Sequence, residues 1–123
     1  MKVLEELVKT GHTDVETVDG ALRVEAILSA RRDSPVYLGH FPGKAVTPGV
    51  LMLQAVVELL ERASGMTLCL KKVVNVKYLE MMEPDDIDGA TLTATLGADG
   101  VANATYTKGC KTYAKIKVQV VEM

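Results

Sequence analysis

The chain has 123 residues, the size of one ordinary domain, and its 14 Lys and Arg against 16 Asp and Glu give a formal net charge of −2. This near-neutral balance, with no basic block, argues against a nucleic-acid partner held through its phosphates and against a polybasic membrane anchor. Hydrophobic residues make up 48% and charged residues 24%, which is typical of a globular protein, so we expect one domain over residues 1–123.

The first 30 residues predict a short helix followed by a hairpin. Residues 4–8 carry apolar side chains at helical spacing, which predicts a short docking helix. Glu5 and Glu6 interrupt the apolar stretch that a secretory signal would need, so we expect a cytoplasmic protein. An Asp-Gly pair at 19–20 indicates a hairpin turn, and the alternation of apolar and polar residues over 21–28 predicts a half-buried strand.

The segment 31–49 is rich in turn-forming residues and holds three of the four prolines of the chain. Such a composition predicts a fixed, irregular loop. Loops held by a rigid scaffold are where binding and catalytic residues concentrate, so we look for function here.

The segment 47–65 is the clearest predicted helix. Thr47 is a candidate N-cap, Pro48 suits the first helical position, and Gly65 suits the position after the last turn. Apolar residues cover most of the circumference, so other elements must wrap the helix, yet it is too short and too polar to span a membrane. One narrow polar stripe remains, which could be no more than a solvated face in which Glu58 pairs with Arg62. The stripe consists of Gln54, Glu58, Glu61 and Arg62.

Four strands are predicted after this helix, and they complete an α+β fold. Residues 68–80, 91–96, 101–107 and 110–120 show the alternation that is typical of strands. An Asp-Gly pair at 99–100 marks a hairpin turn, and the short connections predict an antiparallel meander. We therefore expect a curved antiparallel sheet wrapped around one long central helix.

Cys69 and Cys110 are the only two cysteines. They are far apart in the chain and have no ligand-type spacing to His12 or His40, so no metal site is predicted. We interpret them as two buried small hydrophobic residues, with one disulfide or a free thiol as the alternatives.

Residues 39–51 form the one dense motif and read Gly-His-Phe-Pro-Gly-Lys-Ala-Val-Thr-Pro-Gly-Val-Leu. The motif resembles the signature G-H-F-P-G-x-P-V-x-P-G-V-L of the hot-dog-fold 3-hydroxyacyl-acyl-carrier-protein dehydratases of fatty acid biosynthesis, of FabZ and FabA type. Twelve of the thirteen positions agree or are unspecified, and Ala45 replaces a proline. The predicted order of elements also fits that family over most of the chain, so the resemblance implies a hot-dog fold.

The resemblance implies a lyase that removes water from 3-hydroxyacyl thioesters to give trans-2-enoyl thioesters. His40 would take the α-proton, and the amide of Gly49 at the start of the helix would polarise the thioester carbonyl. Because the thioester itself acidifies this proton, no metal, nucleotide or flavin cofactor is expected. An apolar tunnel beside the helix would hold the acyl chain, although Phe41 could equally be a core residue beneath the loop. The candidate binding residues are Phe41, Val46, Pro48, Leu51 and Leu53.

The chain departs from the family pattern at the catalytic acid. Fourteen residues after His40 the family has Glu or Asp, and this chain has Gln54, whose amide can hold a hydroxyl but cannot donate a proton near neutral pH. Glu58 lies four residues later, one turn along the same face. It is therefore a candidate for a displaced acid that acts through a water.

Partners follow from the same resemblance. It implies a homodimer, in which His40 of one subunit faces the helix of the other, with higher assembly possible. The substrate would be carried by an acyl carrier protein or by coenzyme A. Lysines such as Lys115 and Lys117 could attract an acidic carrier, or form a solvated sheet face.

Gln54 keeps a second interpretation open, namely a catalytically impaired acyl-thioester-binding or partner subunit that retained the fold. A thioesterase on the same scaffold is a third. It would also need an activating carboxylate, for which Glu58 is again the candidate.

Overall fold

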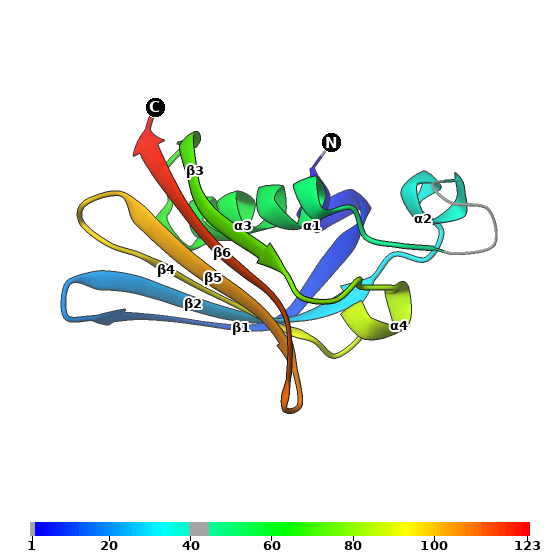
Figure 1. Cartoon of the computed structure of the whole chain (residues 1–123). Helices are drawn as coiled ribbons and strands as arrows, with labels where there is room; N and C mark the ends of the chain where they lie inside the picture. Colours follow the sequence, from blue (N-terminus) through cyan, green and yellow to red (C-terminus); the bar gives the residue numbers. More distant parts are fainter. Residues whose placement is uncertain (1, 40–44) are drawn as a thin grey trace.

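The computed structural model describes residues 2–39 and 45–123. Within them, one long helix is accompanied by three short helices and six strands (Figure 1). In chain order the elements are α1 Val3–Glu6, β1 Val8–Val18, β2 Ala21–Ala30, α2 Pro35–Gly39, α3 Gly49–Ser64, β3 Leu68–Tyr78, α4 Pro84–Ile87, β4 Thr91–Leu96, β5 Val101–Lys108 and β6 Lys111–Glu122.

The six strands form one antiparallel sheet in the order β1-β2-β4-β5-β6-β3, so β1 and β3 are its two edges. The sheet curves around α3, as predicted from the apolar circumference of that helix (Figure 1). At the β1–β2 turn, Asp19 has φ 51° and Gly20 has φ 80°, the conformation that an Asp-Gly hairpin favours. The predicted hairpin and meander are confirmed.

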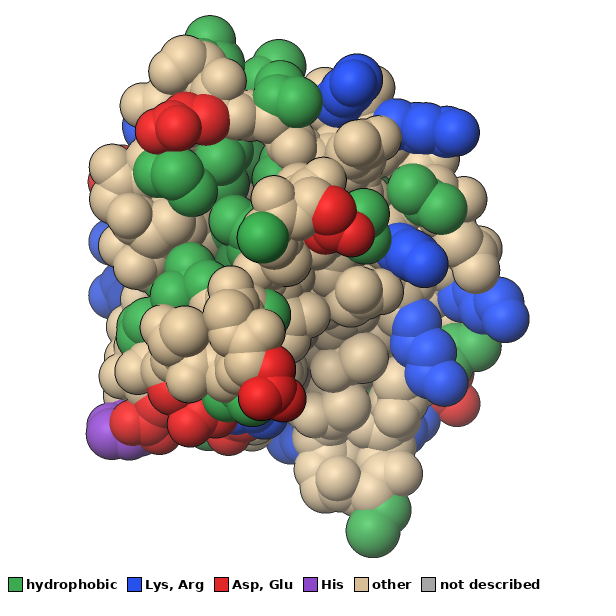
Figure 2. Space-filling model, turned by 90° about the vertical axis from the view of Figure 1, so that its left-hand side faces the viewer, with side chains coloured by type: hydrophobic (Ala, Val, Ile, Leu, Met, Phe, Trp, Pro, Cys, Tyr) green, Lys and Arg blue, Asp and Glu red, His purple; other side chains and the backbone are tan. Residues whose placement is uncertain are grey.

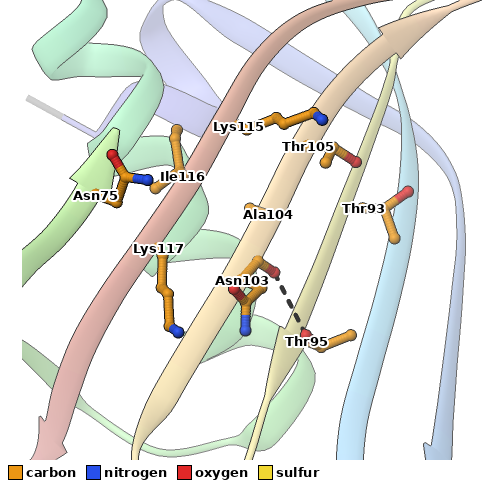
Figure 3. Close-up of a pocket in the computed structure, with 9 residues that line it drawn as sticks. All are labelled: Asn75, Thr93, Thr95, Asn103, Ala104, Thr105, Lys115, Ile116 and Lys117. Carbon is orange, nitrogen blue, oxygen red and sulfur yellow. Dashed lines mark hydrogen bonds between the residues drawn. The ribbon is translucent and has the colours of Figure 1, made fainter. Parts of the chain in front are cut away.

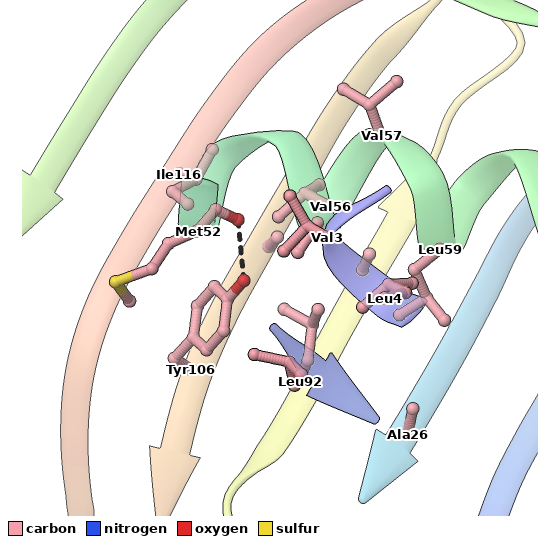
Figure 4. Close-up of a cluster of buried hydrophobic side chains, with 14 of the residues drawn as sticks. Val3, Leu4, Ala26, Met52, Val56, Val57, Leu59, Leu92, Tyr106 and Ile116 are labelled. Carbon is pink, nitrogen blue, oxygen red and sulfur yellow. Dashed lines mark hydrogen bonds between the residues drawn. The ribbon is translucent and has the colours of Figure 1, made fainter. Parts of the chain in front are cut away.

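The core lies between α3 and the inner face of the sheet (Figure 4). Inward-pointing residues of the strands alternate with outward ones, and α1 closes the core beside α3. Tyr106 reaches from β5 under the helix, and its buried hydroxyl donates a hydrogen bond of 2.6 Å to the carbonyl of Met52. Each large apolar side chain buried here contributes roughly 1.5–3 kcal/mol to the hydrophobic free energy of folding.

The boundaries of the central helix differ by one residue from the prediction. Pro48 is the N-cap and its carbonyl accepts from the amides of Leu51 and Met52, so the prediction of Thr47 as N-cap is wrong. Gly65 ends the helix with φ 74°, as predicted.

Two other predictions need correction or addition. Both Cys69 and Cys110 are exposed free thiols, so their interpretation as buried residues is wrong. The hairpin turn at 19–20 implied a strand before it, but the extent of β1 was not predicted, and neither were α2 and α4, since none of these segments shows a clear periodicity. None of the described helices is long and apolar enough to cross a membrane.

Candidate active site

A hollow of about 580 Å³ lies where α3 begins. It is bounded by the segment that leads into α3 and by the segment that leaves β3. Methionine side chains supply much of its apolar wall, and these unbranched side chains adapt readily to ligands of different shape. The lining residues are Val46, Thr47, Pro48, Gly49, Met52, Tyr78, Leu79, Glu80, Met81 and Met82.

Gly49 and Tyr78 are in close contact at this hollow. The Tyr78 hydroxyl donates a hydrogen bond of 2.6 Å to the carbonyl of Gly49. A Cβ at position 49 would lie 2.6 Å from the ring carbon Cζ of Tyr78, so only glycine leaves room for this ring. Partial burial raises the pKa of the Tyr78 phenol, which keeps it in the form that donates.

Thr47, two residues before the first helical residue, is held from two sides. The Thr47 amide donates to the carbonyl of Met82 at 2.8 Å, and its hydroxyl pairs with the hydroxyl of Tyr37 at 2.9 Å. Thr47 and Tyr37 are both buried, and burial raises the pKa of the Tyr37 phenol. These bonds tie the entry into α3 to α2 and to the segment before α4, which both lie at this end of the helix (Figure 1).

The start of α3 supplies amide donors. The first amides of any helix have no carbonyl partner within the helix, and the helix dipole is positive at this end. Gly49 is the first helical residue and lines the apolar hollow. The arrangement is therefore suited to binding a carbonyl oxygen that gains negative charge.

Glu80 is the one carboxylate among the lining residues. It forms an ion pair with Lys111, which also lies 4.9 Å from the centroid of the Tyr113 ring. The bond to Glu80 raises the pKa of Lys111. Both partners are about half exposed, so the pair contributes little to stability.

Gln54 and Glu58 lie further along α3, away from the lining of this hollow. Gln54 is exposed and donates from Nε2 to Oε2 of Glu58 at 3.3 Å. Glu58 is buried, and its two oxygens accept from the backbone amides of Val3 at 3.0 Å and Leu4 at 2.8 Å. The Glu58 carboxylate therefore anchors the first turn of α1 onto α3.

The other members of the polar stripe also bind backbone groups. Glu61 accepts from the amide of Leu68 at 2.9 Å, and Arg62 donates to the carbonyl of Leu4 at 3.3 Å. Among the described residues Arg62 has no ion pair with Glu58, so the predicted pairing of these two side chains is wrong. Three of the four side chains of the stripe therefore bind backbone groups of neighbouring segments, so the stripe is not merely a solvated face.

Of the predicted site residues, Val46, Pro48 and Gly49 line the hollow. The half-buried side chains of Leu51 and Leu53 pack against the core and do not line it. His40 and Phe41 lie outside the described residues.

Sequence reasoning missed Tyr78, Tyr37 and the methionines of the hollow. The sequence places Tyr78 near the end of a predicted strand. Its contact with Gly49, 29 residues away, depends on how the chain folds back.

A family model described as ApeI-like, ApeI dehydratase, matches residues 16–117. The 3-hydroxyacyl-acyl-carrier-protein dehydratase FabZ of Clostridium acetobutylicum is 30% identical over 80 residues, covering 59% of this chain and 57% of the relative. The same enzyme of an Anaeromyxobacter species is 34% identical over 76 residues, covering 62% and 46%. The chain thus spans about half the length of the curated relatives it matches.

Two solved structures share the fold. An uncharacterized protein from Erwinia carotovora subsp. atroseptica has a TM-score of 0.76 at 22% identity, covering 95% of this chain and 98% of that one. The dehydratase heterocomplex ApeI:P from Xenorhabdus doucetiae has a TM-score of 0.67 at 17% identity, covering 91% and 96%. At these identities the likeness concerns the fold, and it confirms the predicted hot-dog architecture.

Proposed function

The chain belongs to the ApeI-like dehydratase family, and we propose that it removes water from 3-hydroxyacyl thioesters, presented on an acyl carrier protein, to give trans-2-enoyl thioesters. The observation that carries this proposal is the motif at 39–51, which runs directly into the helix start where Gly49 lines an apolar hollow. The FabZ relatives are named for 3-hydroxyacyl groups on a carrier protein, which supports the same substrate class here.

In the proposed reaction His40 takes the α-proton and the β-hydroxyl leaves as water. The Gly49 amide donates to the thioester oxygen as negative charge develops on it. Tyr78 is a positioning residue, because its hydroxyl holds the carbonyl of Gly49 and so fixes the first turn of α3. The acyl chain occupies the apolar hollow, where Val46, Pro48 and Met52 contact it.

The leaving hydroxyl needs a proton, and the amide of Gln54 cannot supply one. The resemblance places the helix of one subunit opposite His40 of the other. In this proposal, therefore, Gln54 of the other subunit holds the hydroxyl, and Glu58 of that subunit delivers the proton through a water. The hydrogen bond with Gln54 places Glu58 beside the residue that would hold the hydroxyl, but the carboxylate accepts from Gln54 and from two backbone amides.

Those two amide bonds favour a second candidate function. A carboxylate engaged in anchoring α1 is poorly placed to exchange protons with a substrate, which would leave the site without an acid. The chain would then be an acyl-thioester-binding or partner subunit, and the related fold of a dehydratase heterocomplex makes an unlike partner a concrete possibility.

Turnover of a short 3-hydroxyacyl pantetheine thioester, followed by enoyl absorbance in both directions, separates the two. For the dehydratase we expect activity in the parent chain that His40→Ala abolishes. If the parent chain shows no turnover and the Gln54→Glu variant does, the chain is instead an acyl-thioester-binding or partner subunit. Repeating the assay with carrier-protein and coenzyme A thioesters identifies the carrier.

For assembly we propose a homodimer, as the resemblance implies. The edge strand β3 supports it, because this strand exposes Val73 and Val74 along 11 residues of unpaired backbone edge. Such an edge is a template for pairing with a second copy. Mixing His40→Ala chains with Gln54→Ala chains tests whether sites are shared between subunits. A mixed dimer contains one site with both His40 and Gln54 intact only if the two residues of a site come from different subunits, so activity regained in the mixture would indicate shared sites.

A further inference from the structure

Two neighbouring rows on the outer face of the sheet, which is turned away from α3, are polar across all six strands. Residues that pair directly across neighbouring strands point to the same face, so the strand register defines rows that cross the whole sheet. In the order β1, β2, β4, β5, β6, β3, one row reads Glu16, Arg23, Thr95, Asn103, Lys117, Asn75, and the next reads Asp14, Glu25, Thr93, Thr105, Lys115, Lys77.

One end of this outer face is acidic. Within these rows, β1 and β2 contribute three carboxylates, those of Asp14, Glu16 and Glu25. Arg23 lies between two of them, 3.4 Å from Glu16 and 2.9 Å from Glu25. Arg23, together with Lys9 in a further row of the same face, supplies two positive charges against three carboxylates, so this end keeps negative charge.

The opposite end is basic. β6 and β3 contribute Lys115, Lys117 and Lys77 to the same rows, and Lys72 pairs with Gln119 in the next row. Among the described residues none of these four lysines has an ion-pair partner within the chain. Figure 2 shows the separation, with acidic side chains gathered at its lower left and Lys and Arg along its right-hand side.

The middle of the face is uncharged and carries short side chains. Thr93, Thr95, Asn103 and Thr105 from β4 and β5 border a shallow hollow of about 370 Å³ (Figure 3). Lys115 and Lys117 rise on one side of it. Short side chains allow a second sheet to approach to the usual face-to-face distance of about 10 Å.

We propose that this outer face binds the same face of a second copy of the chain, around a two-fold axis that runs parallel to the strands between β4 and β5. Such an axis reverses the strand order in the second copy, so the acidic β1–β2 end of each chain lies over the basic β6–β3 end of the other. The contact is self-complementary, and each attractive pairing of charges occurs twice.

The charge pattern selects this axis over the other one that could stack the two sheets. A two-fold axis perpendicular to the strands would place β1 over β1 and β3 over β3. Like charges would then face each other at both ends. An acidic macromolecule could bind the lysines alone, but it would leave the carboxylates of β1 and β2 without a partner.

The test uses charge reversal at each end of the full chain. The first variant carries Lys77→Glu, Lys115→Glu and Lys117→Glu, which leaves only Lys72 against three carboxylates at this end. The second carries Asp14→Lys and Glu16→Lys. All five side chains are exposed, so the fold should persist, which circular dichroism checks. Masses are measured by sedimentation velocity for the parent, each variant and a one-to-one mixture.

We expect the parent assembly to have twice the mass of either variant alone at low salt, because each variant carries like charge at both ends. The mixture should regain the parent mass, since a chain acidic at both ends complements one basic at both ends. High salt should reduce the parent to the variant mass, since the Debye length falls from about 30 Å at 0.01 M to about 3 Å at 1 M.

A matched control compares two single changes of equal charge, Lys117→Glu on the outer face and Lys2→Glu outside it. Only the first should weaken assembly. Equal masses for the parent and both charge-reversal variants would overturn the proposal. Variants that dissociate but do not recombine in the mixture would overturn it as well, and would point to an acidic partner at the lysines instead.

Discussion

At the scale of single residues, the contact between Gly49 and Tyr78 decides how the helix start is built. The ring of Tyr78 occupies the space that a side chain at position 49 would need, and its hydroxyl holds the carbonyl of the same residue. A glycine that sequence reasoning assigned to carbonyl binding is therefore also required by packing.

Gly49→Ala should push the Tyr78 ring away and break its hydrogen bond, lowering the free energy of unfolding by about 1 kcal/mol. In a Tyr78→Ala background the same change should be neutral, or stabilising by up to about 1 kcal/mol, because alanine favours the helix. Urea unfolding of the four chains measures this coupling. Gly39→Ala is the control, since a Cβ there meets nothing within 4 Å. Equal effects of Gly49→Ala in both backgrounds would show that the ring does not restrict this position.

Two substitutions distinguish the role of Glu58 as an anchor of α1 from its proposed role as the acid. Glu58→Ala removes the acceptors of two buried amides and should destabilise the chain by about 2–4 kcal/mol. Glu58→Gln keeps one acceptor oxygen, so its loss of stability should be smaller, while any role in proton delivery is lost completely. Thermal unfolding and thioester turnover are measured for both variants. Glu5→Ala, on the exposed side of α1, is the control and should change stability by no more than about 0.5 kcal/mol. Full turnover in a folded Glu58→Gln chain would exclude Glu58 as the acid.

At the scale of elements, α4 is held in place by one cluster of charges. The Asp88 carboxylate accepts from the amide of Ala30 at 2.7 Å and binds Arg32, which also reaches Asp85 at 2.6 Å. These bonds connect the end of β2 to α4, on the side of the molecule where the hollow lies. The amide bond from Ala30, followed by Arg32, holds the pKa of Asp88 below its ordinary value of 3.8.

A carboxyl group whose pKa is lowered by folding stabilises the fold above its unfolded-state pKa, and this contribution is lost as the pH falls through the folded-state pKa. The parent should therefore be more stable than Asp88→Asn at pH 7, and the difference should shrink below pH 3.8. Urea unfolding across this pH range measures the difference. Asp99→Asn, in a distant turn, provides the comparison. A difference that stays constant down to the lowest pH would mean that charge on Asp88 does not matter.

Prediction from sequence succeeded for elements whose signal is local. The apolar circumference of α3, the strict alternation of β4 and β6 and the Asp-Gly turns are all contained in short windows. β1 was not delimited from the sequence because its residues are exposed almost throughout, so that no apolar alternation marks the strand. Its pairing with β2 is what makes it a strand.

The candidate site was harder to predict, because it depends on contacts between distant segments as well as on local sequence. The motif located the helix start and the amide of Gly49, since this information is contiguous in the sequence. Tyr78, Tyr37 and Met82 reach the site only through contacts between segments that are distant in the chain. No single-sequence pattern encodes those distances, so these residues were found only in the folded chain.

At the scale of the whole molecule, the sheet offers two separate surfaces for assembly. The open edge of β3 presents unpaired backbone and exposed apolar side chains, whereas the outer face presents complementary charges. Pairing through one surface does not use the other. High salt should weaken the contact through the outer face and leave the contact through the apolar edge largely intact, so the two can be distinguished in one titration.

The bond between Glu58 and the first turn of α1 also determines how the N-terminus exchanges hydrogen with solvent. Backbone amides at the start of a chain normally exchange within the fastest phase, because terminal turns fray. The amides of Val3 and Leu4 are buried and donate to a carboxylate on the central helix, 54 or 55 residues away. In deuterium they should exchange as slowly as amides of the sheet. The first turn of this chain therefore opens only when the core does.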